Sequence, residues 1–178
     1  QAVSNATRGV ISQDNTTTSN AYAYVTIATN GAATNFGDSV VAVRYAIGCD
    51  HATRGIFAGG LPGGSVVNSM EYVTILSAGD ATDFGNLTAT TYNHATANSI
   101  VRGLIFGGAG RTQAIDYITI ASAGNAADFG DHLSANEPND GWCVHNKLYA
   151  YYSRDRIGSQ EKHTIATAAN DTSFRFSN

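Results

Sequence analysis

Short runs of alternating residues recur along the whole chain and predict β-strands. In the segment Glu71–Ser77, Tyr, Thr and Leu point to one face while Val, Ile and Ser point to the other. Glycine-rich stretches such as Gly59-Gly60 stand between these runs and have the composition of turns. The pattern therefore predicts many short strands joined by tight turns.

The strand pattern repeats at a nearly constant period. Tyr-Val-Thr-Ile, or a close variant, is followed four times by a variant of Asp-Phe-Gly, and the phenylalanines stand at Phe36, Phe84, Phe129 and Phe174. The steps of 48, 45 and 45 residues between them indicate stacked copies of one supersecondary unit. The first and fourth copies are the least regular, as the terminal units of an array are expected to be.

Each repeat resolves into four predicted strands. In the second repeat these are Val43–Cys49, Arg54–Ala58, Glu71–Ser77 and Thr82–Leu87. A four-stranded antiparallel unit of this length is the blade of a β-propeller, and a blade buries its faces only against its neighbours. We therefore predict an all-β protein with a single repeat domain over residues 1–178, a four-bladed β-propeller with blades over residues 1–42, 43–90, 91–135 and 136–178. The alternatives are an open β-solenoid and an open repeat array that closes by oligomerising.

Composition and charge exclude several classes of protein. Charged residues make up 13% of the chain and the net charge is −4, with no cluster of Lys or Arg, so we expect no nucleic-acid partner. No apolar run is long enough to insert into a membrane as a helix. Because the sequence starts at Gln1 without an initiator Met or a signal peptide, we expect a processed chain or a piece of a longer one.

The order of motifs within each repeat resembles the Kelch repeat. The residues that carry the resemblance are Ile56-Phe57-Ala58-Gly59-Gly60 with Tyr72, and Leu104-Ile105-Phe106-Gly107-Gly108 with Tyr117. The usual Kelch tryptophan is absent, and the repeated phenylalanine stands near its place. The resemblance implies a propeller of Kelch-like blades.

A narrower resemblance is to the Kelch-like repeats of tailed-phage virion proteins, especially those of marine phages. It rests on the segments Tyr117–Gly130 and Tyr72–Leu87. It implies a virion-surface or tail-fibre module for structural assembly and host adhesion, with no enzymatic activity and no cofactor. The implied partners are other virion proteins or copies of itself, and a host-surface glycan is a candidate ligand. The alternative is a secreted, extracellular sugar-binding or adhesin propeller of a cell.

Ligand binding is expected in the loops between the second and third strands of each blade. These loops differ from one another while the strands stay alike, which is typical of binding sites on a repeated scaffold. A second candidate is the segment Asn136–Trp142, which breaks the repeat and carries the only tryptophan. The candidate binding residues are Asp14, Asn15, Arg111, Tyr152, Arg154, Asp155, Arg156 and Trp142.

Two Cys-x-His pairs, Cys49 with His51 and Cys143 with His145, lie on the predicted first strands of their repeats. Together they have the ligand set of a tetrahedral zinc site, so a metalloprotein or enzyme built on them is a further alternative. The small apolar residue Ala97 at the equivalent position favours buried thiols instead, and we predict no metal. No Ser-His-Asp arrangement or acid–base pair of carboxylates recurs, which predicts a non-enzymatic protein.

Overall fold

The computed structural model describes residues 2–12, 20–42, 44–109, 113–132, 142–153 and 160–166, and these form four separate antiparallel sheets. Sheet 1 contains β1 (Ala2–Ser4), β2 (Arg8–Ser12), β3 (Ala21–Thr26) and β4 (Thr34–Asp38). Sheet 2 contains β5 (Ile47–His51), β6 (Arg54–Ala58), β7 (Ser69–Thr74) and β8 (Thr82–Asn86), with the short 3-10 helix η1 (Pro62–Gly64) between β6 and β7. Sheet 3 contains β9 (Ala95–Asn98), β10 (Arg102–Phe106), β11 (Ala114–Thr119) and β12 (Ala127–Asp131). Sheet 4 contains β13 (Trp142–His145), β14 (Tyr149–Ser153) and β15 (Gln160–Thr164).

The structure confirms the all-β prediction and the repeated four-stranded unit. Strand β6 coincides with the predicted strand Arg54–Ala58. The first strand of the second repeat begins at Ile47 rather than Val43, because Tyr45 has a φ of 62° and so interrupts extended backbone. No helix in the described part of the chain is long and apolar enough to cross a membrane.

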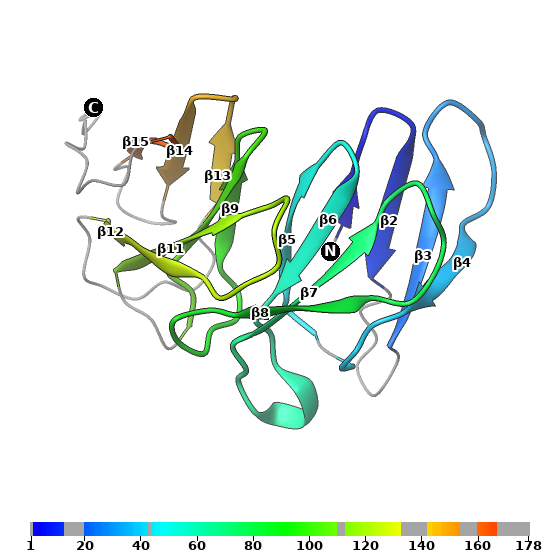
Figure 1. The fold of residues 1–178 in the computed structure, drawn as a ribbon, viewed down its shortest axis with the longest axis horizontal. Helices are drawn as coiled ribbons and strands as arrows, with labels where there is room; N and C mark the ends of the chain where they lie inside the picture. Colours follow the sequence, from blue (N-terminus) through cyan, green and yellow to red (C-terminus); the bar gives the residue numbers. More distant parts are fainter. Residues whose placement is uncertain are drawn as a thin grey trace.

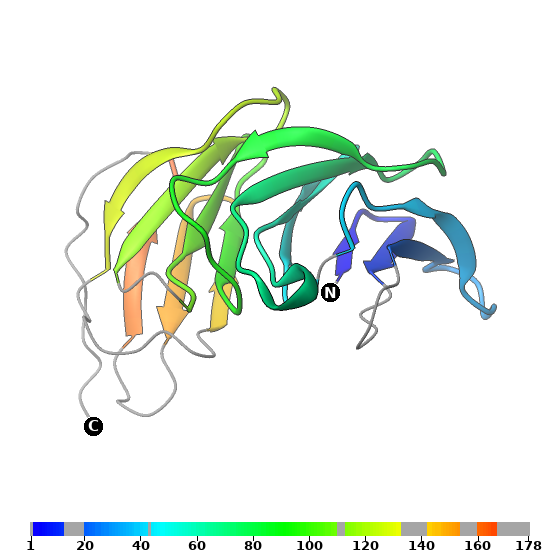
Figure 2. The same ribbon diagram turned by 90° about the horizontal axis from the view of Figure 1, so that it is seen from below.

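The four sheets lie side by side in chain order. Figures 1 and 2 show sheet 1 on one side of the molecule and sheets 3 and 4 on the other, with sheet 2 between them. The first strand of each sheet contacts the first strand of the next, in the order β1, β5, β9 and β13, and we call these four the inner strands. The described residues thus form an open arc of propeller-type blades, and sheets 1 and 4 do not pair to close a ring.

The hydrophobic core is divided into three clusters, one between each pair of consecutive sheets. Between sheets 1 and 2, Val3, Val10 and Phe36 pack against Phe57 and Ile75. The cluster between sheets 2 and 3 and the one between sheets 3 and 4 use equivalent positions. Each sheet is therefore stabilised chiefly by its neighbours, as in other repeat proteins.

An arginine at the start of the second strand joins each sheet to the next. The guanidinium of Arg54 donates a hydrogen bond to the carbonyl oxygen of Ile120 at 3.0 Å, and it lies 4.2 Å from the ring centroid of Tyr72 in its own sheet. The same pair of contacts is made by Arg8, with Ile75 and Tyr24, and by Arg102, with Ile165 and Tyr117.

Sheet 4 exchanges the two partners of this contact. Tyr149 pairs with Thr164 as Arg102 pairs with Thr119, so tyrosine occupies the arginine position. Lys162 occupies the tyrosine position, and its Nζ lies 3.7 Å from the ring centroid of Tyr149. The cation–π contact survives, but this position of sheet 4 carries no guanidinium that could reach a further sheet.

A buried acid makes a second contact between sheets, and sheet 1 lacks it. The carboxylate of Glu71 accepts hydrogen bonds from the hydroxyl of Tyr22 and from the backbone N–H of Val40, both in the repeat before it. Asp116 is the equivalent acid in sheet 3. Sheet 1 has Ala23 at this position. Sheets 1 and 4 therefore each lack one polar contact that the internal interfaces have, at the positions that would meet in a closed four-bladed ring.

Candidate functional site

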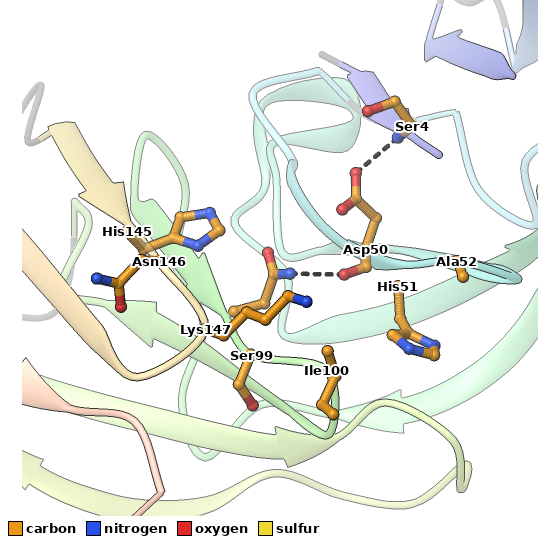
Figure 3. Close-up of a pocket in the computed structure, with 10 residues that line it drawn as sticks. Ser4, Asp50, His51, Ala52, Ser99, Ile100, His145, Asn146 and Lys147 are labelled. Atoms are coloured by element: carbon orange, nitrogen blue, oxygen red, sulfur yellow. Dashed lines mark hydrogen bonds between the residues drawn. The ribbon is translucent and has the colours of Figure 1, made fainter. Parts of the chain in front are cut away.

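Four equivalent turns lie at one end of the inner strands, and residues in or beside them line an open cleft of about 290 Å³ (Figure 3). Each turn joins the first strand of a sheet to the second strand. The lining residues are Ser4 from sheet 1, Asp50, His51 and Ala52 from sheet 2, Asn98, Ser99 and Ile100 from sheet 3, and His145, Asn146 and Lys147 from sheet 4. In an antiparallel meander successive turns lie at opposite ends, so the cleft lies at the other end of sheet 2 from η1 (Figure 1).

A side-chain oxygen closes three of the four turns. The Oδ1 atom of Asn146 accepts hydrogen bonds from the N–H groups of Leu148 and Tyr149, both at 2.8 Å. Asn5 and Ser99 close their turns in the same way. Asparagine and serine suit this task because their short polar side chains reach the backbone two or three residues on. His51 occupies the same position in sheet 2, where its larger ring lines the cleft.

Hydrogen bonds between neighbouring inner strands hold the floor of the cleft. The N–H of Ser4 donates to Oδ2 of Asp50 at 2.6 Å, and Nδ2 of Asn98 donates to the carbonyl oxygen of Asp50 at 2.6 Å. The three residues stand at equivalent positions on β1, β5 and β9, and His145 stands at this position on β13. The cleft thus presents four different side chains at one repeated position.

The ionisable groups that line the cleft are one carboxyl group, two imidazoles and one ammonium group. Burial raises the pKa of Asp50 above its ordinary value of 3.8, while the N–H of Ser4 and the nearby His145 and His51 act in the opposite direction. Figure 3 shows His145 and His51 on opposite sides of the cleft, with Asp50 and Lys147 between them. The site therefore offers hydrogen-bond acceptors and donors from several directions at once.

Among the described residues, the cleft assembles neither a metal-ligand cluster nor a pair of carboxylates. No group of three or more His, Cys, Asp or Glu side chains in the part of the chain that the structure describes is placed to hold a metal ion. Among the residues that line the cleft, Asp50 is the single carboxylate, so a pair of acids for general acid–base hydrolysis is not assembled there.

Most of the binding residues predicted from the loops lie outside the described residues. These are Asp14, Asn15, Arg111, Arg154, Asp155 and Arg156. Trp142 is on β13 with 51% of its surface exposed. Tyr152 is buried in the core rather than exposed on a surface that a ligand could reach. It is 2% exposed and stacks on Phe106 with ring centroids 5.1 Å apart, because its strand position faces the core between sheets 3 and 4.

The two Cys-x-His pairs are not equivalent in the structure. Cys49 pairs with Ile56 and is equivalent to Ala97, whereas Cys143 pairs with Tyr152 and is equivalent to Thr96, one residue away. Burial raises the pKa of both thiols to about 12, so neither is a reactive thiolate at neutral pH. The two histidines do reach the cleft, but the cysteines do not line it.

Sequence reasoning missed the cleft and its residues Asp50, Asn98 and Lys147. The sequence did contain a signal for the cleft. Variation among repeats was used to select the loops between the second and third strands, and the same criterion selects the last residue before the turn between the first and second strands. This position is occupied by Ser4, Asp50, Asn98 and His145.

In comparisons with known proteins, no family model matches the chain and no curated protein matches it significantly.

Proposed function

We propose that this protein is a non-enzymatic adhesion and assembly module whose ligand site is the cleft at the end of the inner strands. The observation that carries the proposal is the convergence of Asp50, His51, His145 and Lys147 from different sheets around one open cleft. A small number of polar groups that converge in a concave site is typical of ligand binding.

The chemistry of the cleft favours a polyhydroxylated ligand such as a host-surface glycan. A sugar hydroxyl both donates and accepts hydrogen bonds, and the cleft offers a carboxylate acceptor beside imidazole and ammonium donors. Ile100, 57% exposed at the rim, adds an apolar surface that matches the C–H face of a sugar ring. A single open site of this size is weak, so multiple copies on one particle would bind through avidity.

The resemblance of the repeats to those of tailed-phage virion proteins supports a place on a virion surface or tail fibre. A secreted cellular adhesin with the same cleft is the second candidate. Mass spectrometry of purified particles separates the two, because a virion module is found in the particle and a secreted adhesin is not.

A glycan array tests the ligand. We expect the wild-type protein to bind a defined set of glycans and the variant Asp50→Asn to lose at least about ten-fold in affinity, since the charged acceptor is removed. Asp83→Asn makes the same change of charge on β8, outside the cleft, and should bind like the wild type. Absence of binding to every glycan, or equal losses in both variants, would contradict a glycan site in this cleft.

A further inference from the structure

The outer faces of the two terminal sheets expose large apolar side chains. Ile27 in sheet 1 is 55% exposed, and Trp142 and Val144 in sheet 4 are 51% and 55% exposed. The terminal units of repeat proteins usually have a polar outer face that keeps them soluble. The exposed apolar residues at both ends of this arc therefore suggest that the ends are covered in the assembled protein.

Each pair of consecutive sheets forms the same kind of interface, and sheet 1 has on its outer face the surface with which the later sheets contact the sheet before them. In sheet 2, a Cβ atom on Gly55 would overlap the side chain of Val3 from sheet 1. In sheet 3, a Cβ atom on Gly103 would lie 2.7 Å from Sγ of Cys49. The glycine thus forms a notch that a side chain of the preceding sheet fills. Gly9 is the equivalent glycine of sheet 1.

The notch at Gly9 is not filled by a neighbouring sheet. Within 4 Å, a Cβ atom on Gly9 would meet Cγ2 of Val25, in the same sheet, at 3.6 Å, and no other described residue is found there. The isoleucine whose carbonyl oxygen accepts the arginine hydrogen bond in the internal interfaces is also uncovered in sheet 1. Ile27 is 55% exposed, whereas its equivalents Ile75 and Ile120 are 0% and 1% exposed.

Sheet 4 carries the matching side chain. Val144 pairs with Tyr151 on the second strand, as Val3 pairs with Val10 and Cys49 with Ile56. Val144 therefore stands at the position that fills the notch in the internal interfaces. It is 55% exposed, whereas Val3 is 1% exposed.

We propose that a second copy of this chain docks head to tail on the first, with Val144 of each copy in the Gly9 notch of the other. Such a contact continues the established interface between consecutive sheets. It also leaves no buried charge unpaired at these two positions, because the arginine and acid positions at this junction are Tyr149 and Ala23. Two arcs joined at both ends form a ring of eight sheets, which is within the range of known propellers, and the heterologous contact closes after two copies.

Sedimentation velocity of the full chain over a range of concentrations tests the proposal. We expect the wild type to sediment with twice the mass of one chain, and Gly9→Leu and Val144→Glu to sediment as single chains. Val101→Glu is the matched control, since Val101 is a valine of similar exposure, 57%, in a turn of sheet 3 away from both ends, and it should stay dimeric. Circular dichroism of each variant shows that the strands are retained.

A disulfide trap tests the contact in a second way, without depending on the fold of Gly9→Leu. In a Cys143→Ser background, the double variant Gly9→Cys with Val144→Cys should be cross-linked by an oxidant into a single dimer band. A wild type that is monomeric at every concentration would overturn the proposal, as would a dimer unaffected by Val144→Glu and not trapped by the cysteine pair. A ladder of larger cross-linked species would overturn the closed ring.

Discussion

At the residue scale, one arginine in each of sheets 1 to 3 connects the repeat motif to the stacking of sheets. Arg54 lies over Tyr72 of its own sheet and donates to the carbonyl oxygen of Ile120 in the next. The guanidinium has both a flat cationic face and several N–H donors, so it makes the two contacts together, which an ammonium group cannot do with the same geometry. The Arg-Gly pair at the start of the second strand, at residues 8–9, 54–55 and 102–103, is therefore part of the interface between sheets.

We expect Arg54→Met to lower the free energy of unfolding by about 1–3 kcal/mol, since it removes a cation–π contact and a hydrogen bond to a carbonyl group. Chemical denaturation monitored by circular dichroism measures this loss. Arg44→Met is the control, because the Arg44 guanidinium lies 5.7 Å from the ring of its neighbour Tyr45, and it should change the stability by less than about 0.5 kcal/mol. Equal effects of the two substitutions would show that the contact with Ile120 contributes nothing.

Asp50 gives the protein a predicted dependence of stability on pH. Its pKa is raised by burial in the folded state, so between pH 3.8 and the folded pKa the folded protein binds more protons than the unfolded chain. The contribution of Asp50 to stability is therefore fully present below pH 3.8 and is lost as the pH rises through the folded pKa. Asp50→Asn should remove the contribution of Asp50 to the pH dependence of stability. The unfolding free energy of the variant should therefore rise relative to that of the wild type as the pH increases above 3.8.

Urea denaturation at a series of pH values checks this expectation. Asp83→Asn, which removes an exposed carboxyl group of the same sheet, is the control for the loss of one negative charge. A difference between Asp50→Asn and the wild type that stays constant with pH, or that moves against the variant as the pH rises, would contradict a raised pKa of Asp50.

At the element scale, the repeated phenylalanine is the extra residue of a β-bulge. Met70 pairs with Gly85 and the next residue, Glu71, pairs with Asp83, so Phe84 between them has no partner. The same shift occurs at Phe36 and Phe129. A bulge bends its strand and strengthens the local twist. The motif Asp-Phe-Gly thus encodes a bend in the outer strand, and the phenylalanine points into the core with 2–3% exposure in all three sheets.

Gly85 is required by this bulge, and its substitution gives a prediction for the element. Its φ is +137°, and a Cβ atom would lie 2.5 Å from the carbonyl oxygen of Gly124 in sheet 3. We expect Gly85→Ala to cost about 2–4 kcal/mol of unfolding free energy, from backbone strain and the overlap with backbone atoms. Thermal unfolding followed by calorimetry measures it.

Gly124→Ala is the matched control, because it changes the other side of the same contact. A Cβ atom on Gly124 meets no atom within 4 Å, so we expect a change below about 0.5 kcal/mol. If Gly85→Ala were as stable as Gly124→Ala, the close approach of the bulge to sheet 3 would not hold in solution.

The sequence predicted the elements better than the site. Period and alternation identify Arg54–Ala58 and the Phe strands, because each repeat restates the same pattern and errors in one copy are corrected by the others. The cleft could not be found in this way, because Asp50 and His145 meet through the packing of inner strands from different sheets. The equivalence of Cys49 and Cys143 failed for a related reason, since strand register decides it and the fourth repeat is offset by one residue.

At the scale of the whole molecule, periodicity predicts stacked sheets but does not decide whether they close. Three internal interfaces use the same arginine and buried isoleucine, and the open ends differ from them at Tyr149 and Ala23. These two substitutions can be recognised only when the register of each strand is known. The two ends of the chain's row of sheets are thus where it departs from its own repeat.

The isoleucine at the end of each third strand separates the stability of one arc from that of the assembled ring. Ile75 is 0% exposed against sheet 1, so Ile75→Ala should cost about 2–5 kcal/mol at any protein concentration. Ile27 is the equivalent residue on the uncovered face of sheet 1. Ile27→Ala should lower the free energy of unfolding little in dilute solution and progressively more as the protein concentration rises. The reason is that a second copy binds only the folded form and so stabilises it by mass action. Denaturation midpoints measured from low to high micromolar protein test this difference. A midpoint of the wild type that does not move with concentration, with Ile27→Ala running parallel to it, would mean that the outer face of sheet 1 meets only solvent.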